Sequence, residues 1–183
     1  MNAKIDLSDI VLKTERLILR PFRLDDLDDF YHYASVPGVG EMAGWQHHQN
    51  KEESLTILNR FIDGRKTFAI EYDNKVIGSL GIEEYDEESY PEFEDQLGRS
   101  IGYILAKEYW GQGLMTEAVK AVINYCFDEL DLDFLEAGYF SYNKKSARVL
   151  EKCGFLFYSK ANKMVLGKET EAIRLMLINT RLI

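Results

Sequence analysis

A mixed α/β domain is the fold class that this sequence predicts. The apolar run 101–106 is short enough for a buried strand, and it ends at a glycine-bearing turn from which a helical pattern starts. Two further apolar runs, 67–72 and 76–82, flank Asp73-Asn74, which is a strong hairpin signal. Strand and helix patterns continue without an internal repeat or a low-complexity linker, so we expect the 183 residues to form one domain.

The first third of the chain predicts one strand and two helices. Residues 12–22 have the pattern of a strand. A helix is expected over 24–33, because two aspartates load its first turn and its apolar residues share one face. Glycines and a proline make 37–44 a loop. A second amphipathic helix is expected over 52–63, and Gly64 stands at the usual position for ending it.

The second half alternates strands and helices around the central turn. Leu114, Ala118, Val122 and Cys126 recur at four-residue spacing, which predicts a helix that starts just after Gly113. The remaining elements expected from local patterns are strands over 134–142, 155–158 and 172–179 and a helix over 144–152. This order supports the mixed α/β class.

The composition is that of a soluble globular protein, with 46% hydrophobic and 29% charged residues. No apolar run approaches membrane-spanning length and the first residues lack a signal peptide's apolar region, so we expect a cytoplasmic protein without a membrane partner. Cys126 and Cys153 are expected to be reduced thiols on apolar helical faces. No metal site is expected, because His32 stands alone and the adjacent His47 and His48 cannot chelate from one helix face. We interpret these histidines as surface or pocket-rim residues.

The charge is distributed unevenly along the chain. The formal net charge is −9, and the acidic excess lies in residues 1–96, whereas residues 97–183 are slightly basic. The run 83–95 is rich in carboxylates and contains no basic residue. A broad basic face is lacking, which argues against a nucleic-acid partner. The acidic run is either a solvated loop or a source of a field that attracts a cationic substrate.

The turn before the central helix is suited to binding an anion. The first N–H groups of a helix have no intrahelical partners, and the helix dipole places partial positive charge there. Gly111 and Gly113 would let the backbone approach a phosphate closely. A Walker loop is a poor fit because Leu114 and Met115 follow Gly113, and the dinucleotide fingerprint lacks its third glycine at Thr116. A nucleotide-binding enzyme is therefore a disfavoured alternative.

Three motifs resemble one protein family. The segment Tyr109-Trp-Gly-Gln-Gly-Leu-Met-Thr-Glu-Ala118 is similar to the cofactor motif of the GNAT superfamily of acyl-CoA-dependent N-acyltransferases. It is most similar to the branch that contains the ribosomal-protein N-terminal acetyltransferases. The segment Asn143-Lys-Lys-Ser-Ala-Arg-Val-Leu-Glu-Lys-Cys-Gly-Phe155 resembles that branch's Asn-x-x-Ser helix followed by Gly-Phe, and Thr14-Glu-Arg-Leu-Ile-Leu-Arg-Pro21 resembles its first strand. The three motifs follow the family's order across most of the chain.

The resemblance implies a fold, an activity and a cofactor. The fold would be a central mixed sheet, mostly antiparallel, with splayed central strands and helices on both faces. The activity would be transfer of the acetyl group of acetyl-CoA to a primary amine. The central strand's backbone would pair with the pantetheine, the amides after the turn would receive the pyrophosphate, and basic side chains would lie nearby. The implied acetyl-CoA site comprises Ile104, Leu105, Gln112, Gly113, Leu114, Met115, Thr116, Asn143, Lys145 and Arg148.

The sequence indicates the catalytic residues less completely than the acetyl-CoA site. Ser146 matches the serine that this branch is thought to use on the departing thiol, and we expect it to relay a proton through water because serine is a weak acid. Many relatives place an acid tyrosine where this chain has Leu150. The base is unassigned: Glu83 at a strand exit and Tyr103 on the central strand are candidates, and attack through ordered water without a base is the alternative.

The acceptor is expected to be an amine bound between the loop at 38–48 and the acidic run. Trp45, Tyr85 and Tyr90 are the substrate-binding candidates, because their rings offer contact area. An acidic wall favours a basic protein N-terminus first and a small cationic amine, such as a polyamine or an aminoglycoside, second. An acyl-CoA-binding regulatory module without turnover stays open, as does a homodimer formed through exposed strand edges.

Overall fold

The computed structural model describes residues 1–180. Their strands and helices, in chain order, are β1 (Leu12–Lys13), β2 (Ile18–Pro21), α1 (Leu27–Ala34), α2 (Lys51–Gly64), β3 (Thr67–Tyr72), β4 (Lys75–Glu83), β5 (Gly98–Leu105), α3 (Leu114–Asp128), β6 (Phe134–Phe140), α4 (Lys144–Lys152), β7 (Leu156–Val165) and β8 (Lys168–Ile178). The short 3-10 helices between them are η1 (Leu24–Asp26), η2 (Gly40–Ala43), η3 (Glu87–Ser89), η4 (Pro91–Phe93) and η5 (Lys107–Tyr109). The mixed α/β class expected from the sequence is confirmed.

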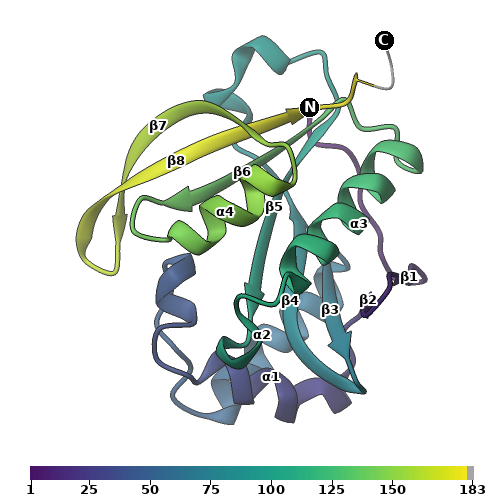
Figure 1. The fold of residues 1–183 in the computed structure, drawn as a ribbon, viewed down its shortest axis with the longest axis vertical. Coiled ribbons are helices and arrows are strands. Elements are labelled where there is room, and N and C mark those ends of the chain that lie inside the picture. Colours follow the sequence, from purple (N-terminus) through teal and green to yellow (C-terminus); the bar gives the residue numbers. More distant parts are fainter. Residues whose placement is uncertain (181–183) are drawn as a thin grey trace.

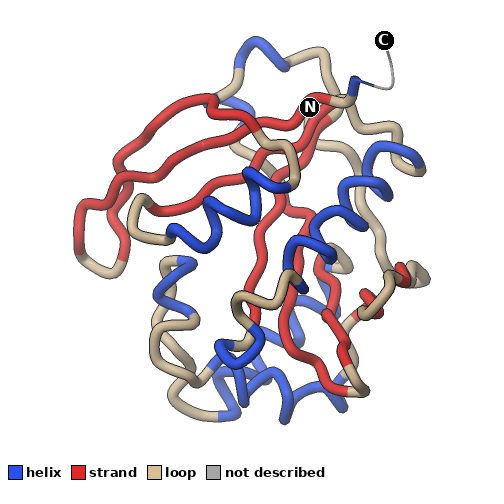
Figure 2. Tube along the Cα trace, in the orientation of Figure 1, coloured by secondary structure: helices blue, strands red, loops and turns tan. Residues whose placement is uncertain are grey.

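The described strands form one eight-stranded sheet in the order β1-β2-β3-β4-β5-β6-β8-β7, in which β5–β6 is the one parallel pair. Helices α3 and α4 lie in front of the strands in Figure 1, and the strands run behind them in Figure 2. Helices α1 and α2 cover the opposite face at the β2–β4 end of the sheet. Helices therefore lie on both faces, as expected.

The alternation of side chains along each strand explains why both faces are covered. Phe68 and Ile70 of β3 pack in the core beneath α3, whereas Ala69 between them packs against α1 and α2. On the far half of the sheet, the acidic segment covers the face opposite α3 and α4, where its Tyr85 and Tyr90 pack against Phe134 and Met176. A sheet that is apolar on both faces needs both layers to exclude water.

The two central strands diverge along their length. β5 pairs with β6 from Gly98 to Ile101, opposite Phe134 to Ala137. Beyond that point 102–105 continue to pair with β4, while 138–140 pair with β8. This is the splay that the resemblance implied, and it opens the sheet in its middle. The backbone edge of 102–105 on the β6 side is left without a strand partner within the described residues.

Several expected elements differ from the observed ones in their boundaries. Residues 12–22 do not form one strand, because β1 and β2 are a short hairpin in which Leu12 faces Leu19. The Thr14 hydroxyl accepts a hydrogen bond from the Leu17 amide at 2.9 Å, so a side chain turns the backbone where the pattern predicted continuity. Gly64 does not end α2 in a left-handed conformation; Arg65 does, with a φ of 53°.

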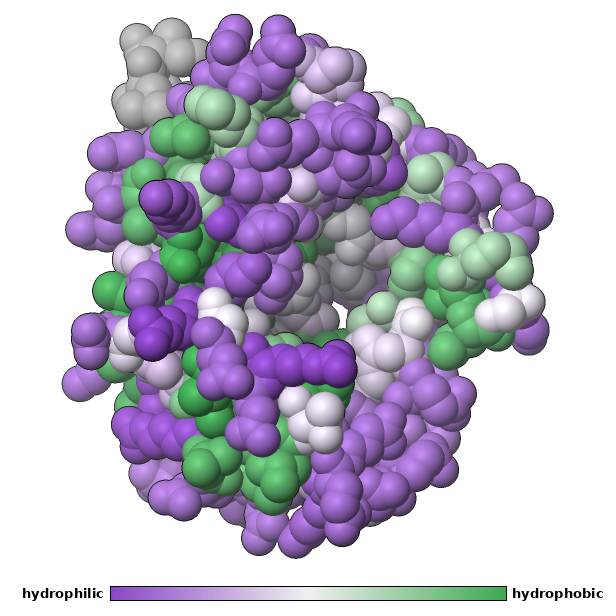
Figure 3. All heavy atoms as spheres, turned by 180° about the vertical axis from the view of Figure 1, so that it is seen from behind, coloured by the Kyte–Doolittle hydropathy of each residue, from purple (hydrophilic) through white to green (hydrophobic). Residues whose placement is uncertain are grey.

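The strand expected at 155–158 continues to Val165 as β7 and forms a long hairpin with β8. Polar and lysine residues interrupt its pattern, so only pairing with β8 reveals its length. Met164 and Leu166 are exposed near the hairpin turn, and Figure 3 shows hydrophobic residues gathered at that edge of the molecule. Because β7 is an edge strand, its pairing with a second copy stays a prediction.

No helix within residues 1–180 combines the length and the apolar character needed to cross a bilayer.

Candidate active site

A cavity of about 510 Å³ lies where β5 and β6 diverge. Alternation along β5 divides its walls, because Tyr103 and Leu105 pack with the α3 core whereas Ile104 packs with the α1 and α2 core. Helices α3 and α4 line one side, and η2 with parts of β6, β7 and β8 line the other. The cavity therefore passes through the sheet. We call its two ends the α3/α4 side and the η2 side.

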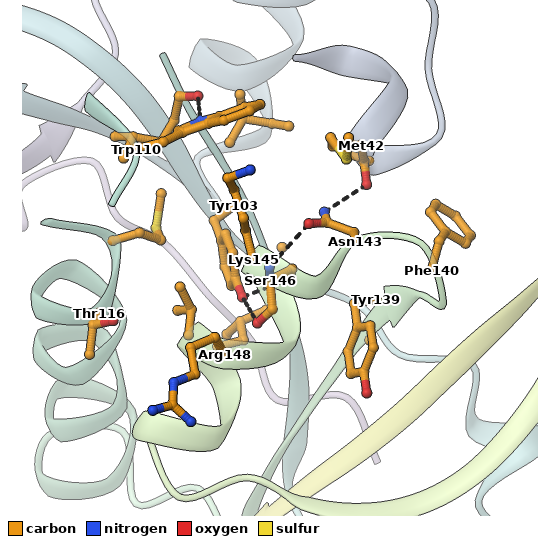
Figure 4. Close-up of a pocket in the computed structure, with 18 of the residues that line it drawn as sticks. Met42, Tyr103, Trp110, Thr116, Tyr139, Phe140, Asn143, Lys145, Ser146 and Arg148 are labelled. Carbon is orange, nitrogen blue, oxygen red and sulfur yellow. Dashed lines mark hydrogen bonds between the residues drawn. The ribbon is translucent and has the colours of Figure 1, made fainter. Parts of the chain in front are cut away.

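The N-terminus of α3 opens onto the α3/α4 side. Gly113, Leu114, Met115 and Thr116 line the cavity there, and Gly113 has a φ of 80°, which a glycine adopts without strain. The amides of the first helical turn have no intrahelical acceptors, so this end of the cavity offers hydrogen-bond donors and partial positive charge to an anion. Figure 4 shows Thr116 and the Arg148 side chain facing the space between α3 and α4.

The N-terminal strand region fixes this turn. The Glu117 carboxylate accepts hydrogen bonds from the Thr14 hydroxyl at 2.6 Å and from Arg16 Nε at 2.7 Å. Arg16 also donates to the carbonyl oxygen of Gln112 at 3.1 Å. Partial burial would raise the pKa of Glu117, but these hydrogen bonds outweigh it and hold that pKa below its usual value. The Thr14 to Pro21 motif thus supports the anion-binding turn from outside the cavity.

Trp110 connects β5 to the cavity wall. Its indole Nε1 donates a hydrogen bond of 2.7 Å to the carbonyl oxygen of Leu105, at the end of β5. The Lys145 Nζ atom lies 5.1 Å from the centre of the Trp110 ring, within the range of a cation–π interaction. Both residues line the cavity (Figure 4). The sequence interpretation included Trp110 in the cofactor motif but did not predict that it lines the cavity.

Tyr103 and Ser146 meet across the α3/α4 side. Their hydroxyl oxygens are 2.9 Å apart, and both residues line the cavity (Figure 4). Burial raises the pKa of Tyr103, while the Ser146 hydrogen bond opposes that shift in part. The phenol is therefore protonated at neutral pH. A protonated phenol does not suit the role of a general base that the sequence suggested for Tyr103.

Asn143 holds α4 in place. Its side-chain oxygen accepts a hydrogen bond from the Ser146 amide at 3.1 Å, which caps the helix, and its amide nitrogen donates to the Met42 carbonyl oxygen at 3.0 Å. The Tyr142 hydroxyl donates to the carbonyl oxygen of Glu41 at 2.7 Å. Asn143 lines the cavity, but its polar atoms are engaged by protein groups rather than directed to a ligand. These bonds fix η2 against the β6–α4 turn.

Glu136 is the acidic group of the η2 side. Its strand neighbours Leu135 and Ala137 pack in the α3 core, so alternation turns Glu136 to the opposite face. Its carboxylate accepts hydrogen bonds from the Ser100 hydroxyl and from the Tyr90 hydroxyl, the latter at 3.0 Å. A carboxylate has lone pairs for about four such bonds, so capacity for a further donor remains.

The cavity is electropositive although the whole chain is acidic. Among the described residues that line it, Glu136 is the one acidic side chain, and the basic ones are Lys145, Arg148, Lys152, Lys163 and Arg174. The first three lie on α4 beside the start of α3, where they suit the phosphate groups of coenzyme A. The other two lie on β7 and β8, on the η2 side. The donor set of the α3/α4 side therefore fits acetyl-CoA.

The structure brings most of the expected acetyl-CoA residues to the cavity, with one exception. The residues that line it are Ile104, Leu105, Gly113, Leu114, Met115, Thr116, Asn143, Lys145 and Arg148. Gln112 does not line it, because its side chain turns back to donate a hydrogen bond of 3.0 Å to the Glu108 carbonyl oxygen.

The expected substrate residues lie elsewhere. Tyr85 and Tyr90 are buried against Phe134, and only Tyr90 reaches the site, through its hydrogen bond to Glu136. Trp45 covers Gly40, outside the cavity lining. The acidic run thus covers the sheet, and its carboxylates do not line the cavity.

Two other expectations need correction. Glu83 is exposed at the end of β4, where its carboxylate is 3.3 Å from the Thr67 hydroxyl, and it does not line the cavity. His48 is neither a surface nor a rim residue: it is 6% exposed, with its ring nitrogen 2.7 Å from the Ser54 hydroxyl. Burial lowers the pKa of His48. Both cysteines are free, as expected.

A sequence signal for the missed charged residues does exist. Glu136 interrupts the apolar run 134–140, and Arg174 interrupts the apolar run 172–178. A single charge within an otherwise buried strand is costly unless it faces a cavity or a partner. These single charges within apolar runs therefore indicated, in the sequence, the residues of the η2 side.

Comparison with known proteins places this geometry in a family. The acetyltransferase (GNAT) domain family matches residues 16–156. The N-acetyltransferase p20 of Bacillus licheniformis is 30% identical over 152 residues, which cover 79% of this chain and 81% of that protein. A GNAT-family acetyltransferase from Bacillus anthracis superimposes with a TM-score of 0.81 at 22% identity, over 93% of this chain and 99% of that chain.

A third relative has a named acceptor. The ribosomal-protein-S5-alanine acetyltransferase of Vibrio fischeri superimposes with a TM-score of 0.71 at 23% identity, over 94% of this chain and 98% of that chain. The family match sets aside the nucleotide-binding enzyme. The chain belongs to the GNAT family and is an acetyl-CoA-dependent N-acetyltransferase.

Proposed function

We propose that the chain forms one acetyltransferase domain that acetylates the α-amine at the N-terminus of a protein or peptide. The observation that carries this proposal is the position of Glu136, the one carboxylate among the described residues that line the cavity. It lies on the η2 side, across the sheet opening from the Ser146 hydroxyl. An incoming ammonium group thus has one negatively charged partner there.

Each residue has a chemical role in this proposal. The amides at the start of α3, with Lys145 and Arg148, would hold acetyl-CoA, which supplies an activated acetyl thioester. Glu136 would bind the ammonium group and accept its proton, because only a neutral amine is nucleophilic. Ser146 Oγ would deliver a proton to the departing thiolate and take one from the Tyr103 hydroxyl. After product release, the Tyr103 phenolate would regain a proton from solvent and Glu136 would lose its proton to solvent.

A protein N-terminus is favoured over a small polycation. Lys163 and Arg174 line the η2 side, and they would repel an acceptor that carries several positive charges. The cationic acceptor suggested by the acidic run therefore loses its support. The likeness to the S5-alanine acetyltransferase of Vibrio fischeri supports an N-terminal α-amine.

Thiol release from acetyl-CoA in the presence of heptapeptides tests the proposal. Each peptide has a free α-amine and a single lysine, so that mass spectrometry can distinguish acetylation of the α-amine from acetylation of the side chain. We expect acetylation at the α-amine. Glu136→Gln should lower kcat/KM for the peptide about a hundredfold, because it removes both the charge and the proton acceptor. Its dissociation constant for acetyl-CoA should be unchanged.

The matched control is Glu169→Gln, which neutralises an exposed carboxylate on β8 that is hydrogen-bonded to Asn162 outside the cavity. It should leave all constants unchanged. Acetyl groups found only on the lysine Nζ, or equal rates for the wild type and Glu136→Gln, would contradict the proposal.

A further inference from the structure

Arg174 is a cation without a protein counter-ion. It lies on β8 directly opposite Gly138 of β6, half-buried in the cavity wall. Within residues 1–180, no carboxylate pairs with its guanidinium and no acceptor meets its N–H groups. Its guanidinium lies over the Tyr90 ring, whose centre is 5.5 Å from Cζ. A half-buried guanidinium normally has an anionic partner, because burial costs it hydration.

The nearest candidate partner is already engaged. Glu136 lies opposite Met176, two residues along β8, so Glu136 and Arg174 are diagonal neighbours in the sheet. The Glu136 carboxylate instead accepts hydrogen bonds from Ser100 and Tyr90. The Tyr90 side chain therefore holds the acidic group with its hydroxyl and the basic group with its ring. The two opposite charges are kept side by side and unpaired.

Lys163 adds a second positive charge to the same face. It pairs with Thr170, and alternation along β8 places Thr170 on the same face as Arg174. Lys163 and Arg174 both line the cavity. The η2 side thus presents one place for a cation and, next to it, a place for an anion. A guanidinium binds a carboxylate through two parallel hydrogen bonds, which makes it selective for that group.

We propose that Arg174 binds a carboxylate of the acceptor, so that the preferred N-terminus carries an acidic side chain in its first two residues. This inference rests on the proposed function, because it assumes that the α-amine binds at Glu136. Diagonal neighbours in antiparallel strands lie about 7–8 Å apart. A carboxylate on the first or second residue of a peptide can bridge such a separation. Lys163 contributes attraction at longer range.

Peptide pairs that differ in one group test this inference. Heptapeptides that begin Ser-Asp, Ser-Asn and Ser-Lys are compared by kcat/KM with the wild type, Arg174→Gln and Arg174→Lys. Free serine and serinamide form a second pair, which tests whether a free α-carboxylate serves instead. We expect the wild type to prefer Ser-Asp over Ser-Asn by about tenfold, the size of a charge-assisted hydrogen bond.

The variants test whether Arg174 is the source of the preference for Ser-Asp. Arg174→Gln should remove it, and Arg174→Lys should keep part of it because the charge remains without the planar fork. Lys168→Gln, which neutralises an exposed cation at the start of β8 outside the cavity lining, is the matched control and should keep the full preference. An unchanged KM for acetyl-CoA in each variant shows that the domain is folded.

The remaining outcomes separate this inference from the proposed function. Equal use of Ser-Asp and Ser-Asn overturns the inference and leaves the N-terminal function standing. If no peptide is acetylated but serine is preferred over serinamide in an Arg174-dependent way, the peptide acceptor is overturned and the acidic side chain with it. If none of these acceptors gives thiol release, both the proposed function and this inference are overturned.

Discussion

The phenolic oxygen of Tyr103 lies 2.9 Å from the hydroxyl oxygen of Ser146, which joins the central strand to α4 inside the cavity. Because burial raises the pKa of Tyr103, the phenol keeps its proton at neutral pH, and either hydroxyl can donate to the other. In the proposed reaction this pair would act as one unit rather than as two independent residues.

Substitution of either hydroxyl should slow turnover by a similar factor. Tyr103→Phe and Ser146→Ala are each expected to lower kcat about tenfold to a hundredfold, because each interrupts the same proton relay. The double variant should be no slower than the slower single variant, as residues acting in one unit are not additive. Steady-state thiol release measures all three. Effects that multiply in the double variant would show that the two hydroxyls act separately.

Glu117 gives the fold a pH-dependent contribution. Its pKa is lowered in the folded state, so its stabilising effect is full above the unfolded value of about 4.5 and is lost as the pH falls through the folded value. Glu117→Gln should lower the free energy of unfolding by about 1–2 kcal/mol at pH 7, because hydrogen bonds to Thr14 and Arg16 are weakened. Urea unfolding at several pH values should show this gap closing toward pH 3.

The control for that series is Glu129→Gln, an exposed carboxylate just after α3. It should leave the free energy of unfolding unchanged across the same range. A gap between the wild type and Glu117→Gln that persists at pH 3 would refute the role of the charge.

Trp110 should report the binding of acetyl-CoA. Trp110→Phe removes the hydrogen bond to the Leu105 carbonyl and replaces the indole under Lys145 with a smaller ring that attracts a cation less strongly, so we expect the dissociation constant for acetyl-CoA to rise about tenfold. The chain has two tryptophans, and Trp45 lies outside the cavity lining. Quenching of fluorescence by acetyl-CoA should therefore persist in Trp45→Phe and disappear in Trp110→Phe. Quenching carried by Trp45 instead would place the cofactor elsewhere.

Gly44 should matter to the acceptor more than to acetyl-CoA. Its φ is 90°, and an added Cβ would lie 2.8 Å from the Phe140 ring, so Gly44→Ala should displace η2 and cost at least about 1 kcal/mol of stability. The acceptor KM should rise while the affinity for acetyl-CoA is kept.

The comparison variant is Gly64→Ala, in which a Cβ at the end of α2 would meet open space. It should raise the free energy of unfolding by about 0.5–1 kcal/mol and leave both substrate constants unchanged. Equal loss of acetyl-CoA affinity in Gly44→Ala would mean that η2 does not act on the acceptor.

Local patterns in the sequence predict most of the fold. The β3–β4 hairpin and α3 follow from turn chemistry and periodicity, which are properties of neighbouring residues. β7 was predicted too short, because its residues 159–164 gain their strand structure from pairing with β8. The hydrogen bond that turns the chain at Thr14 likewise depends on one side-chain conformation, which periodicity does not encode.

The residues of the site likewise fall into those that contiguous motifs predict and those that only the fold brings together. Thr116 and Ser146 belong to contiguous motifs, so the sequence could assign them to the α3/α4 side. The η2 side is assembled from Glu136, Arg174 and η2, which are distant in sequence, and only the splay of β5 from β6 brings them together. Tyr90 misled the interpretation for the same reason, because its burial against the sheet depends on long-range packing.

A structure with a bisubstrate analogue, in which coenzyme A is joined through an acetyl group to the α-amine of a Ser-Asp peptide, tests the account most directly. The account predicts the pantetheine on the α3/α4 side and the peptide on the η2 side. The α-nitrogen should lie within hydrogen-bond reach of Glu136, and the aspartate on Arg174. A peptide bound on the α3/α4 side, or an α-nitrogen remote from Glu136, would contradict the central claim that the two substrates meet through the opening in the sheet.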